Sequence, residues 1–417
     1  MNYLIRNVTI LDPDGPWHLR QTNLYIRDGK ITDPGKAPGS VKEWDLNGAY
    51  CSPGWVDIGA HSGDPGFEHR EDFSTLADAA LAGGFTGLAC FPNTAPVTHS
   101  KPGILYMLRK SDRLPVDIYP TGAISMDCAG TDITEMMDMH AAGAVAFTDG
   151  KQPVQHAGLM MRALQYVRAF DGLIINRPMD LAIAPHGEMH EGYTSTSLGL
   201  TGIPALAEEL IVQRDLDLLA YTGSRLLLHT ISSARSVELI RQAKSRGLNA
   251  MASVAAHNLY FTDEDLAGFD SNLKLAPPLR SADDRKALLE ALLVGTIDLV
   301  SSNHTPLEEE AKKLEFPYAK SGALGLETTF SALNTARPAP EKLAEILAIR
   351  PRKALNLAVP HIEEGAAANL TFFDPEREWV YTGKDIRSKS RNSPFVGRTL
   401  QGKVLGTYHK GELRKNP

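Results

Sequence analysis

Residues 53–97 read PGWVDIGAHSGDPGFEHREDFSTLADAALAGGFTGLACFPNTAPV, and this stretch indicates the fold. A first apolar run leads through Asp57 to His61, a helix is expected to begin near Ser74, and a second apolar run spans residues 85–91. The stretch therefore predicts a strand, helix, strand unit with polar residues just after its strands. In a parallel α/β barrel, that position is where active sites lie.

The same alternation continues to about residue 357. Further apolar runs of strand length occur at residues 114–123, 144–148, 173–175, 226–229, 248–254 and 297–301. Before the last of them, Ser281 begins a segment with a helix-capping pattern and Gly295 ends it. Runs that are apolar throughout indicate a parallel sheet covered by helices on both faces. About eight such units predict an α/β protein with a TIM-like (β/α)8 barrel over residues 53–357.

Residues 1–52 and 358–417 have a different pattern. Short β-rich runs such as residues 3–11 and 369–374 alternate with Gly and Pro turn signals, and no helical period stands out. We therefore expect the two terminal segments to form one small composite β-sandwich beside the barrel.

The composition is that of a soluble globular protein, since 43% of the 417 residues are hydrophobic and 22% are charged. A formal net charge of −7 gives no reason to expect a nucleic acid or an anionic membrane as partner. Cys51, Cys90 and Cys128 are an odd number at unrelated spacings, which indicates neither a disulfide framework nor a zinc knuckle. No run approaches the length of a membrane span and no export signal is evident, so we expect a cytoplasmic protein.

Several longer phrases carry a family resemblance, among them PGWVD, DPGFEHRED, AAGAVAFTDG, SSARSVELIRQAK, KLAPPLRSADDRKAL and SKSRNSPFVGR. In this order and spacing, the chain resembles the dihydroorotases of the amidohydrolase superfamily along nearly its whole length. The resemblance implies a β/α barrel flanked by a composite sandwich, with a zinc centre at the carboxyl ends of the strands. It also implies reversible cyclisation of carbamoyl aspartate to dihydroorotate in pyrimidine synthesis.

The first strand departs from the family pattern, which supplies two metal-binding histidines and a substrate-binding arginine. The corresponding positions are Gly59, His61 and Gly63. Glycine has no donor atom, and without the arginine the bidentate clamp on a carboxylate is missing. His61 is either a surviving ligand or a histidine hydrogen-bonded at a strand end; we favour the second, because zinc usually needs three or four protein ligands.

The other family ligand positions are also altered. Asp149 is retained in the phrase FTDG, although a turn cap accounts for it equally well. Asn176 and Thr230 stand where the family has ligand histidines, and an amide oxygen competes poorly for zinc. His229 precedes Thr230 and is expected to face away from the site unless a bulge re-aims it, because successive strand residues point to opposite faces.

The position of the family's catalytic aspartate is Asn303, followed by His304. An asparagine does not titrate near neutral pH and so cannot serve as the general base. A substrate-site asparagine of the family is replaced by Ala276, whereas Asn93 is retained and is a candidate substrate-binding residue.

The sequence therefore favours a non-catalytic dihydroorotase homologue with no cofactor. By resemblance, such a protein supports the assembly or activity of aspartate carbamoyltransferase, as a homo-oligomer or a hetero-oligomer. The alternative is an active zinc-dependent cyclic amide hydrolase with a reduced site around His61, Asp149 and either His229 or His304. A third possibility is a small-molecule sensor that uses the vacated pocket.

Overall fold

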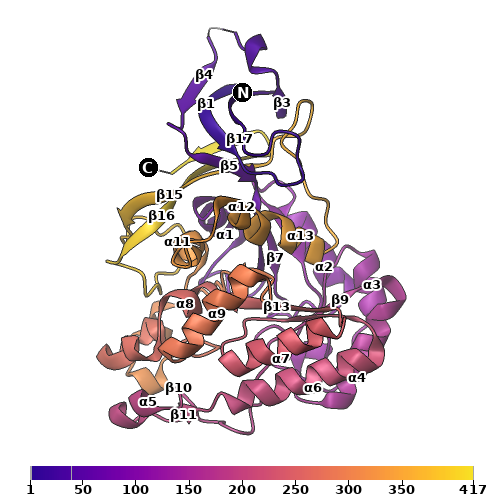
Figure 1. Ribbon diagram of the computed structural model, residues 1–417. Coiled ribbons are helices and arrows are strands. Elements are labelled where there is room, and N and C mark those ends of the chain that lie inside the picture. Colours follow the sequence, from indigo (N-terminus) through magenta and orange to yellow (C-terminus); the bar gives the residue numbers. More distant parts are fainter. Residues whose placement is uncertain (1, 39, 417) are drawn as a thin grey trace.

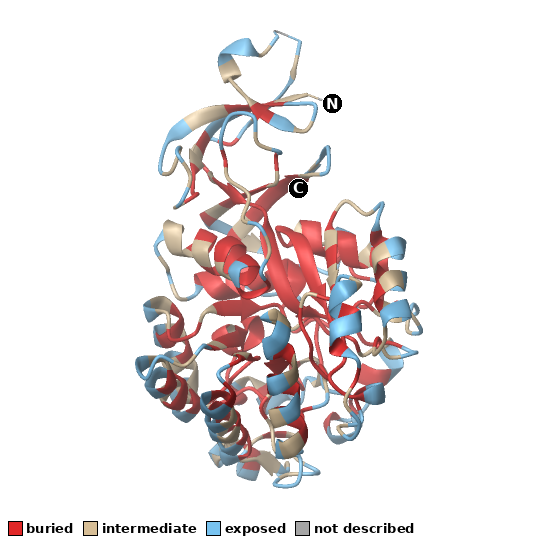
Figure 2. Ribbon diagram, turned by 90° about the vertical axis from the view of Figure 1, so that its right-hand side faces the viewer, coloured by how far each residue is buried: buried red, intermediate tan, exposed pale blue. Residues whose placement is uncertain are grey.

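The computed structural model describes residues 2–38 and 40–416. Strands from both ends of the chain lie together at the top of the view in Figure 1, and the strand and helix units of the central segment lie below them. In Figure 2 the buried residues gather on the strands and on the inward faces of the helices, while the outward helix faces are exposed. No helix among the described residues is both long and apolar enough to cross a membrane.

The terminal segments form one hydrogen-bonded sheet in the order β17-β16-β15-β5-β1-β2-β3, with β4 paired to β1. Its strands are β1 (Tyr3–Ile10), β2 (Gln21–Arg27), β3 (Lys30–Thr32), β4 (Lys42–Asp45), β5 (Tyr50–Pro53), β15 (Leu370–Val380), β16 (Thr399–His409) and β17 (Glu412–Lys415). The two ends of the chain meet where β5 pairs antiparallel with β15. We refer to this layer as the terminal sheet.

The terminal sheet curls around its own core, so that its two halves face each other like the layers of the expected composite sandwich, with hydrogen bonding continuous between them. The rings of Tyr3 on β1 and Tyr408 on β16 lie 6.0 Å apart, although β5 and β15 stand between these strands in the sheet. Buried side chains from β1, β2, β3, β5, β15 and β16 form a single apolar cluster. The sequence predicted the apolar alternation of these strands but not that hydrogen bonding would continue from one layer to the other.

The central segment contains two parallel sheets, β6-β7-β8 and β14-β13-β12-β9. The strands are β6 (Trp55–Ala60), β7 (Phe85–Cys90), β8 (Asp117–Pro120), β9 (Leu173–Asn176), β12 (Arg225–Leu228), β13 (Ala250–Ala255) and β14 (Leu299–Ser301). Phe147 forms parallel bridges to both Gly122 and Ile174, so residues 145–148 link the two sheets on one side. On the other side, Ser301 Oγ donates to the carbonyl oxygen of Ile58 over 2.7 Å. We call this succession of strands the barrel and the end where its strands finish the mouth.

Helices and short pairings connect the barrel strands and cover them. They are α1 (Phe73–Ala82), α2 (Lys101–Ser111), α3 (Met136–Ala141), α4 (Ala157–Val167), α5 (Tyr193–Leu198), α6 (Leu206–Thr222), α7 (Ala234–Ser245), α8 (Ala256–Tyr260), α9 (Ala282–Val294), α10 (Glu309–Lys312), α11 (Thr329–Asn334), α12 (Pro340–Ala344) and α13 (Arg350–Ala354), with the pair β10 (Met189–His190) and β11 (Gly202–Ile203). The predicted helix between Ser281 and Gly295 is confirmed as α9: Ser281 caps the amide of Asp284, and Gly295 ends it at φ +84°.

The terminal sheet packs against the barrel end opposite the mouth. Trp55, at the start of β6, lies 5.2 Å from the ring of Phe373 on β15 and 5.3 Å from that of Phe330 on α11. Thr371 Oγ1 donates to the carbonyl oxygen of Gly84, just before β7. This arrangement closes one end of the barrel with buried aromatic rings and leaves the mouth as the open end.

Candidate functional site

A cavity of about 250 Å³ lies at the barrel mouth. It is lined by residues that follow the carboxyl ends of several strands: His61, Phe91, Gly150, Lys151, Arg177, His229, Ala276, Asn303, Thr305, Ser321 and Gly322. Ligand sites of parallel barrels are built at this end. Most sites for drug-sized ligands are larger, about 300–1,000 Å³, so this cavity suits a compact molecule.

Two imidazoles meet around one aromatic ring in this mouth cavity. The Phe91 ring lies edge-on to His61, at 5.6 Å between ring centroids, and to His229, at 5.0 Å. The expectation that His229 would face away is wrong. Strand β12 ends at Leu228 and Thr230 adopts a φ of +54°, so the strict alternation of a strand no longer applies at His229.

The His229 ring occupies the space above Gly59. A Cβ at position 59 would lie 2.7 Å from both Cε1 and Nε2 of His229, and Gly59 itself has a φ of +111°. Gly63 is equally constrained: at its φ of +71°, a Cβ would lie 2.2 Å from the carbonyl oxygen of Glu71. Both positions therefore need glycine in this backbone, and a side chain at either would force the surroundings to move.

His229 is held on one side only. Its Nδ1 lies 3.0 Å from Ser253 Oγ, whereas its buried Nε2 has no hydrogen-bond partner in the part of the chain that the structure describes. Burial and the charge of Arg177 lower the pKa of His229 to about 3. Burial, followed by the charges of Lys151 and Arg177, places the pKa of His61 well below its ordinary value. Both rings are therefore neutral at physiological pH.

Lys151 and Arg177 bring positive charge to the mouth cavity. Burial, with the charges of Arg70 and Arg177, lowers the pKa of Lys151 to about 8, and burial lowers that of Arg177 to about 10. Both remain protonated at neutral pH, and no carboxylate lines the cavity beside them. Sequence reasoning did not single out these two residues. The signal was present, since each stands within a few residues of an apolar run that ends at Thr148 or Ile175.

Asp149 and Asn93 shape the turn that carries Lys151. The Asp149 carboxylate accepts from the amides of Ile124 and Ser125, both at 2.9 Å. The Asn93 side chain donates to the Asp149 carbonyl oxygen over 3.0 Å and accepts from the Lys151 amide over 2.9 Å. Neither side chain lines the mouth cavity. Asp149 thus acts as the turn cap that the sequence offered as one of its two interpretations.

Asn176 and Thr230 also bond within the fold. The Asn176 side chain accepts from the amide of Val154 at 3.2 Å and donates to Asp215 Oδ2 at 2.6 Å. Thr230 Oγ1 donates to the carbonyl oxygen of His229 over 2.8 Å. Neither residue is among those that line the mouth cavity.

Asn303 faces the mouth cavity, whereas the neighbouring His304 does not. Asn303 has a φ of +47° and donates from Nδ2 to the Ala276 carbonyl oxygen over 3.2 Å. His304 is fully buried, with Nε2 at 3.4 Å from Glu71 Oε2 and Nδ1 accepting from the Gly325 amide over 3.3 Å. The His61 amide donates to the His304 carbonyl oxygen over 3.1 Å, but the His304 side chain does not line the cavity that His61 and His229 share.

A zinc ion does not fit this set of side chains. Two imidazoles line the cavity, with no carboxylate or thiol, and no cluster of three or more His, Cys, Asp or Glu side chains suited to a metal occurs within residues 2–38 and 40–416. Zinc sites normally supply three or four protein ligands. The two cations at the same cavity would also repel a divalent metal ion.

Comparison with known proteins identifies the relatives of this chain. A family model described as "Dihydro-orotase-like" matches residues 48–236. Over 99% of its length, the chain is 41% identical to a dihydroorotase from Pelotomaculum thermopropionicum, of which the match covers 98%. It is 38% identical to a dihydroorotase from Syntrophus aciditrophicus, with 99% of both chains covered. The chain belongs to the dihydroorotase family.

The fold extends to solved structures of related hydrolases. An L-hydantoinase (dihydropyrimidinase) from Arthrobacter aurescens superposes with a TM-score of 0.86 at 25% identity, covering 99% of this chain and 95% of that one. A dihydropyrimidinase from Brevibacillus agri, at 19% identity, gives a TM-score of 0.81 over the same shares of the two chains. This dihydroorotase homologue therefore has the α/β architecture of the hydantoinases.

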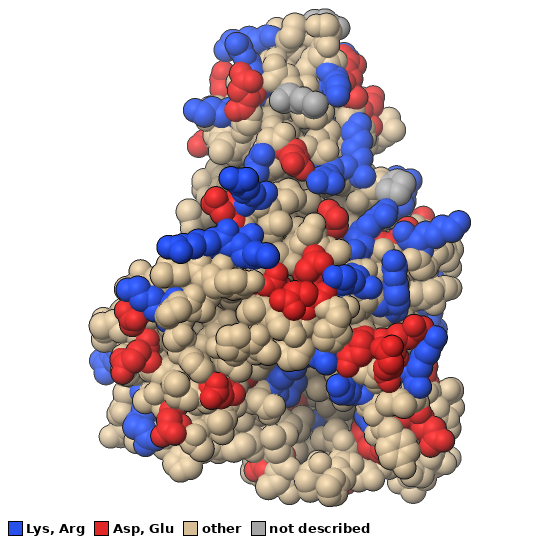
Figure 3. Space-filling view, turned by 180° about the vertical axis from the view of Figure 1, so that it is seen from behind, with Lys and Arg blue, Asp and Glu red and all other residues tan. Residues whose placement is uncertain are grey.

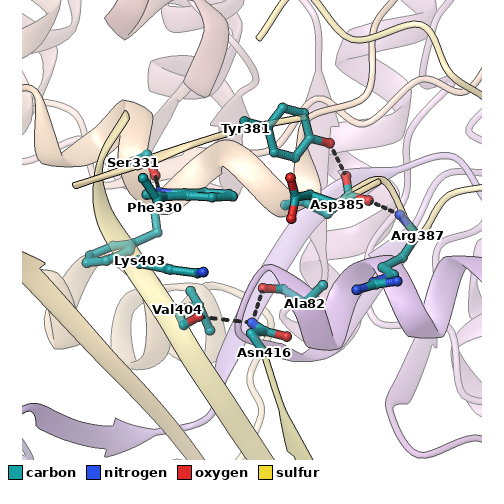
Figure 4. A pocket seen from close by; sticks show the side chains of 11 residues that line it. Ala82, Phe330, Ser331, Tyr381, Asp385, Arg387, Lys403, Val404 and Asn416 are labelled. Carbon is teal, nitrogen blue, oxygen red and sulfur yellow. Dashed lines mark hydrogen bonds between the residues drawn. The ribbon is translucent and has the colours of Figure 1, made fainter. Parts of the chain in front are cut away.

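A second cavity lies where the barrel meets the terminal sheet (Figure 4). It is lined by residues of α1, α11, β15 and β16, and Asn416 spans part of its wall by donating to the carbonyl oxygens of Ala82 and Val404. Its volume is about 30 Å³, which is room for water but not for a metabolite. The mouth cavity is therefore the better candidate site.

Proposed function

We propose that this chain is a non-catalytic member of the dihydroorotase family, which acts in pyrimidine biosynthesis by supporting the assembly or activity of aspartate carbamoyltransferase. The observation that carries the proposal is the content of the mouth cavity: two neutral imidazoles, two cations and one amide, without a carboxylate. Opening or closing a cyclic amide at a metal centre needs metal ligands and a proton acceptor, and this cavity supplies neither set.

The absence of a suitable proton acceptor supports a non-catalytic role. General bases work best with a pKa near the working pH and contribute ~10²–10⁴-fold to rate. Asn303 has no titratable group near neutrality, and the pKa values of His61 and His229 lie far below it. None of the three therefore replaces a catalytic aspartate.

The backbone around the mouth cavity also supports a non-catalytic role. A side chain at Gly59 would meet His229, and one at Gly63 would meet the backbone of Glu71. Reintroducing the family's histidine and arginine at these positions would thus require several accompanying shifts, which is what we expect of a scaffold kept for other reasons than hydrolysis.

The proposal is tested by purifying the tagged chain from its own cells at natural abundance. We expect aspartate carbamoyltransferase to co-purify in a fixed ratio, and deletion of the chain to reduce the size or activity of the transferase assembly. A transferase that assembles and works fully without this chain would exclude the role. The matched control is a Tyr221→Ala chain, altered at an exposed side chain that does not line the cavity.

A second candidate is an active zinc-dependent dihydroorotase with a reduced site. It is favoured by the meeting of His61 and His229 at Phe91 in one cavity. Metal analysis of purified protein separates the two functions. Zinc at one equivalent, removable by a chelator together with dihydroorotate turnover, would support the enzyme and refute the non-catalytic role.

A further inference from the structure

We infer that the mouth cavity binds a compact oxyanion with two negative charges, held by Lys151 and Arg177. The ligand class is a phosphate or a short dicarboxylate. This inference goes beyond the proposed partner role and does not depend on it, because the site would bind its anion in the isolated chain.

The first observation is that both cations lack a counter-charge. Neither Lys151 nor Arg177 forms an ion pair within the described part of the chain. Arg177 donates from one guanidinium nitrogen to the Lys151 carbonyl oxygen, which is a neutral acceptor. The carboxylate of Glu308 acts on Lys151 electrostatically, but it is already paired with Arg70 and with Lys320.

Unpaired cations in a partly enclosed site are costly to the fold. Charged groups removed from water are normally paired or shift their pKa, and here burial depresses the pKa of both groups. An anion between them would supply the missing partner, and the guanidinium can offer two parallel donors to a carboxylate or phosphate.

A second, independent observation is the free nitrogen of His229. Its side chain is 2% exposed, it lines the mouth cavity, and its Nε2 has no partner among the described residues. If Ser253 donates to Nδ1, Nε2 carries the proton and can donate to an anion. Buried polar atoms are normally hydrogen-bonded, so this orphaned nitrogen indicates that a ligand or an ordered water completes the site.

The dimensions and walls of the cavity narrow the ligand class. A volume of about 250 Å³ admits a small molecule, and Phe91 and Ala276 offer apolar wall beside the charged groups. Two cations facing one small space favour a dianion over a monoanion, because each charge contributes separately to the attraction. Inorganic phosphate and succinate represent the two members of this class.

The test is titration of the purified full-length chain with inorganic phosphate and, separately, with succinate, followed by calorimetry. We expect at least one of them to bind with a single site and to raise the melting temperature. Acetate, a monoanion, is expected to bind more weakly. Binding of phosphate alone identifies a phosphate-bearing ligand, and binding of succinate alone identifies a dicarboxylate.

Substitutions at Lys151 and Arg177 test whether these two cations bind the anion. Lys151→Gln and Arg177→Gln are each expected to weaken binding roughly 30-fold, the lower range for removing one partner of a buried charge pair. Lys151→Arg keeps the charge and should retain most of the affinity. The matched control is Lys286→Gln, which removes the same charge from an exposed position on α9 and should leave binding unchanged.

Failure of both dianions to bind at millimolar concentration would overturn the inference, as would binding that survives in both Gln variants. Misfolding is monitored by the melting temperature of each variant without ligand. If Arg177→Gln does not fold, the comparison of Lys151→Gln with Lys151→Arg still decides the outcome. Because no transferase is present in these titrations, their result is separate from that of the co-purification.

Discussion

The two ends of the barrel are built from similar residue types in opposite ways. At the closed end, Asp117 pairs with both His409 and Lys410 at 2.9 Å. At the mouth, Lys151 and Arg177 have no such counter-charge in the described structure. One end is satisfied internally, whereas the other is left to be completed by a ligand, as functional sites often are.

The largest expected effect lies at the closed end. Trp55→Ala should lower the free energy of unfolding by ~3–5 kcal/mol, because it empties the space between Phe373 and Phe330. Urea denaturation measures the change. The control is Tyr221→Ala, since Tyr221 is 76% exposed and should change stability by less than ~0.5 kcal/mol. Equal losses in the two variants would refute the packing role of Trp55.

The next effect is expected at the mouth, where Gly63→Ala should cost ~3 kcal/mol or more. The new Cβ would clash with the Glu71 carbonyl oxygen, and the alanine would also have to adopt the positive φ of Gly63. Gly130→Ala is the matched control, because Gly130 has a φ of +75° and open space around it. Its cost should be only the ~1–2 kcal/mol of left-handed backbone. The difference between the variants measures the steric contact alone, and a difference near zero would contradict the described backbone.

A smaller effect is expected from pH at the closed end. Burial raises the pKa of Asp117, but hydrogen bonds and charges from His409 and Lys410 outweigh it and lower the pKa to about 2. The depressed pKa means that the carboxylate stabilises the fold above about pH 4 and that this stability is lost as the pH falls towards 2. We expect a loss on the order of 1–2 kcal/mol in acid denaturation. Asp117→Asn should remove this part of the pH dependence; an unchanged acid profile would count against the pairing.

The smallest expected effects are changes in the free energy of unfolding, and they have opposite signs at two lysines. Lys151→Met should raise the free energy of unfolding by ~1 kcal/mol in the absence of anions, because it removes an unpaired, partly buried charge. Lys410→Met should lower it by ~0.5–1 kcal/mol, because it breaks the pair with Asp117. Thermal unfolding of both variants in anion-free buffer makes the comparison. A loss of stability at both positions would mean that the two ends do not differ as described.

The local structure of this chain could be predicted well from its sequence. The helix between Ser281 and Gly295 followed from its cap and its terminal glycine, because both signals act through neighbouring backbone groups. The residues at the altered family positions, such as Gly59 and Asn303, could likewise be read directly. The contacts of Gly59 could not be predicted, because the space above it is filled by the ring of His229, which lies 170 positions further along the chain.

The mouth cavity was less predictable for similar reasons. The direction of His229 depends on where β12 ends, and strand ends are poorly marked in sequence. Lys151 and Arg177 resembled ordinary polar residues after a strand, because their lack of counter-charge is a property of the assembled barrel. The curl of the terminal sheet depends on pairing between distant segments, which alternation alone does not specify.

The pairing of β5 with β15 also sets the order in which the chain can be completed. During synthesis on the ribosome, Tyr50–Pro53 emerges more than three hundred residues before its partner segment. Until the last part of the chain is released, β1 and β2 can pair with their N-terminal neighbours, but β5 presents an unpaired edge, which is prone to associate with other chains. The barrel can collapse on its own local units, but the layer that closes it is the final step of folding. Nascent chains of this protein should therefore be most vulnerable to aggregation just before termination.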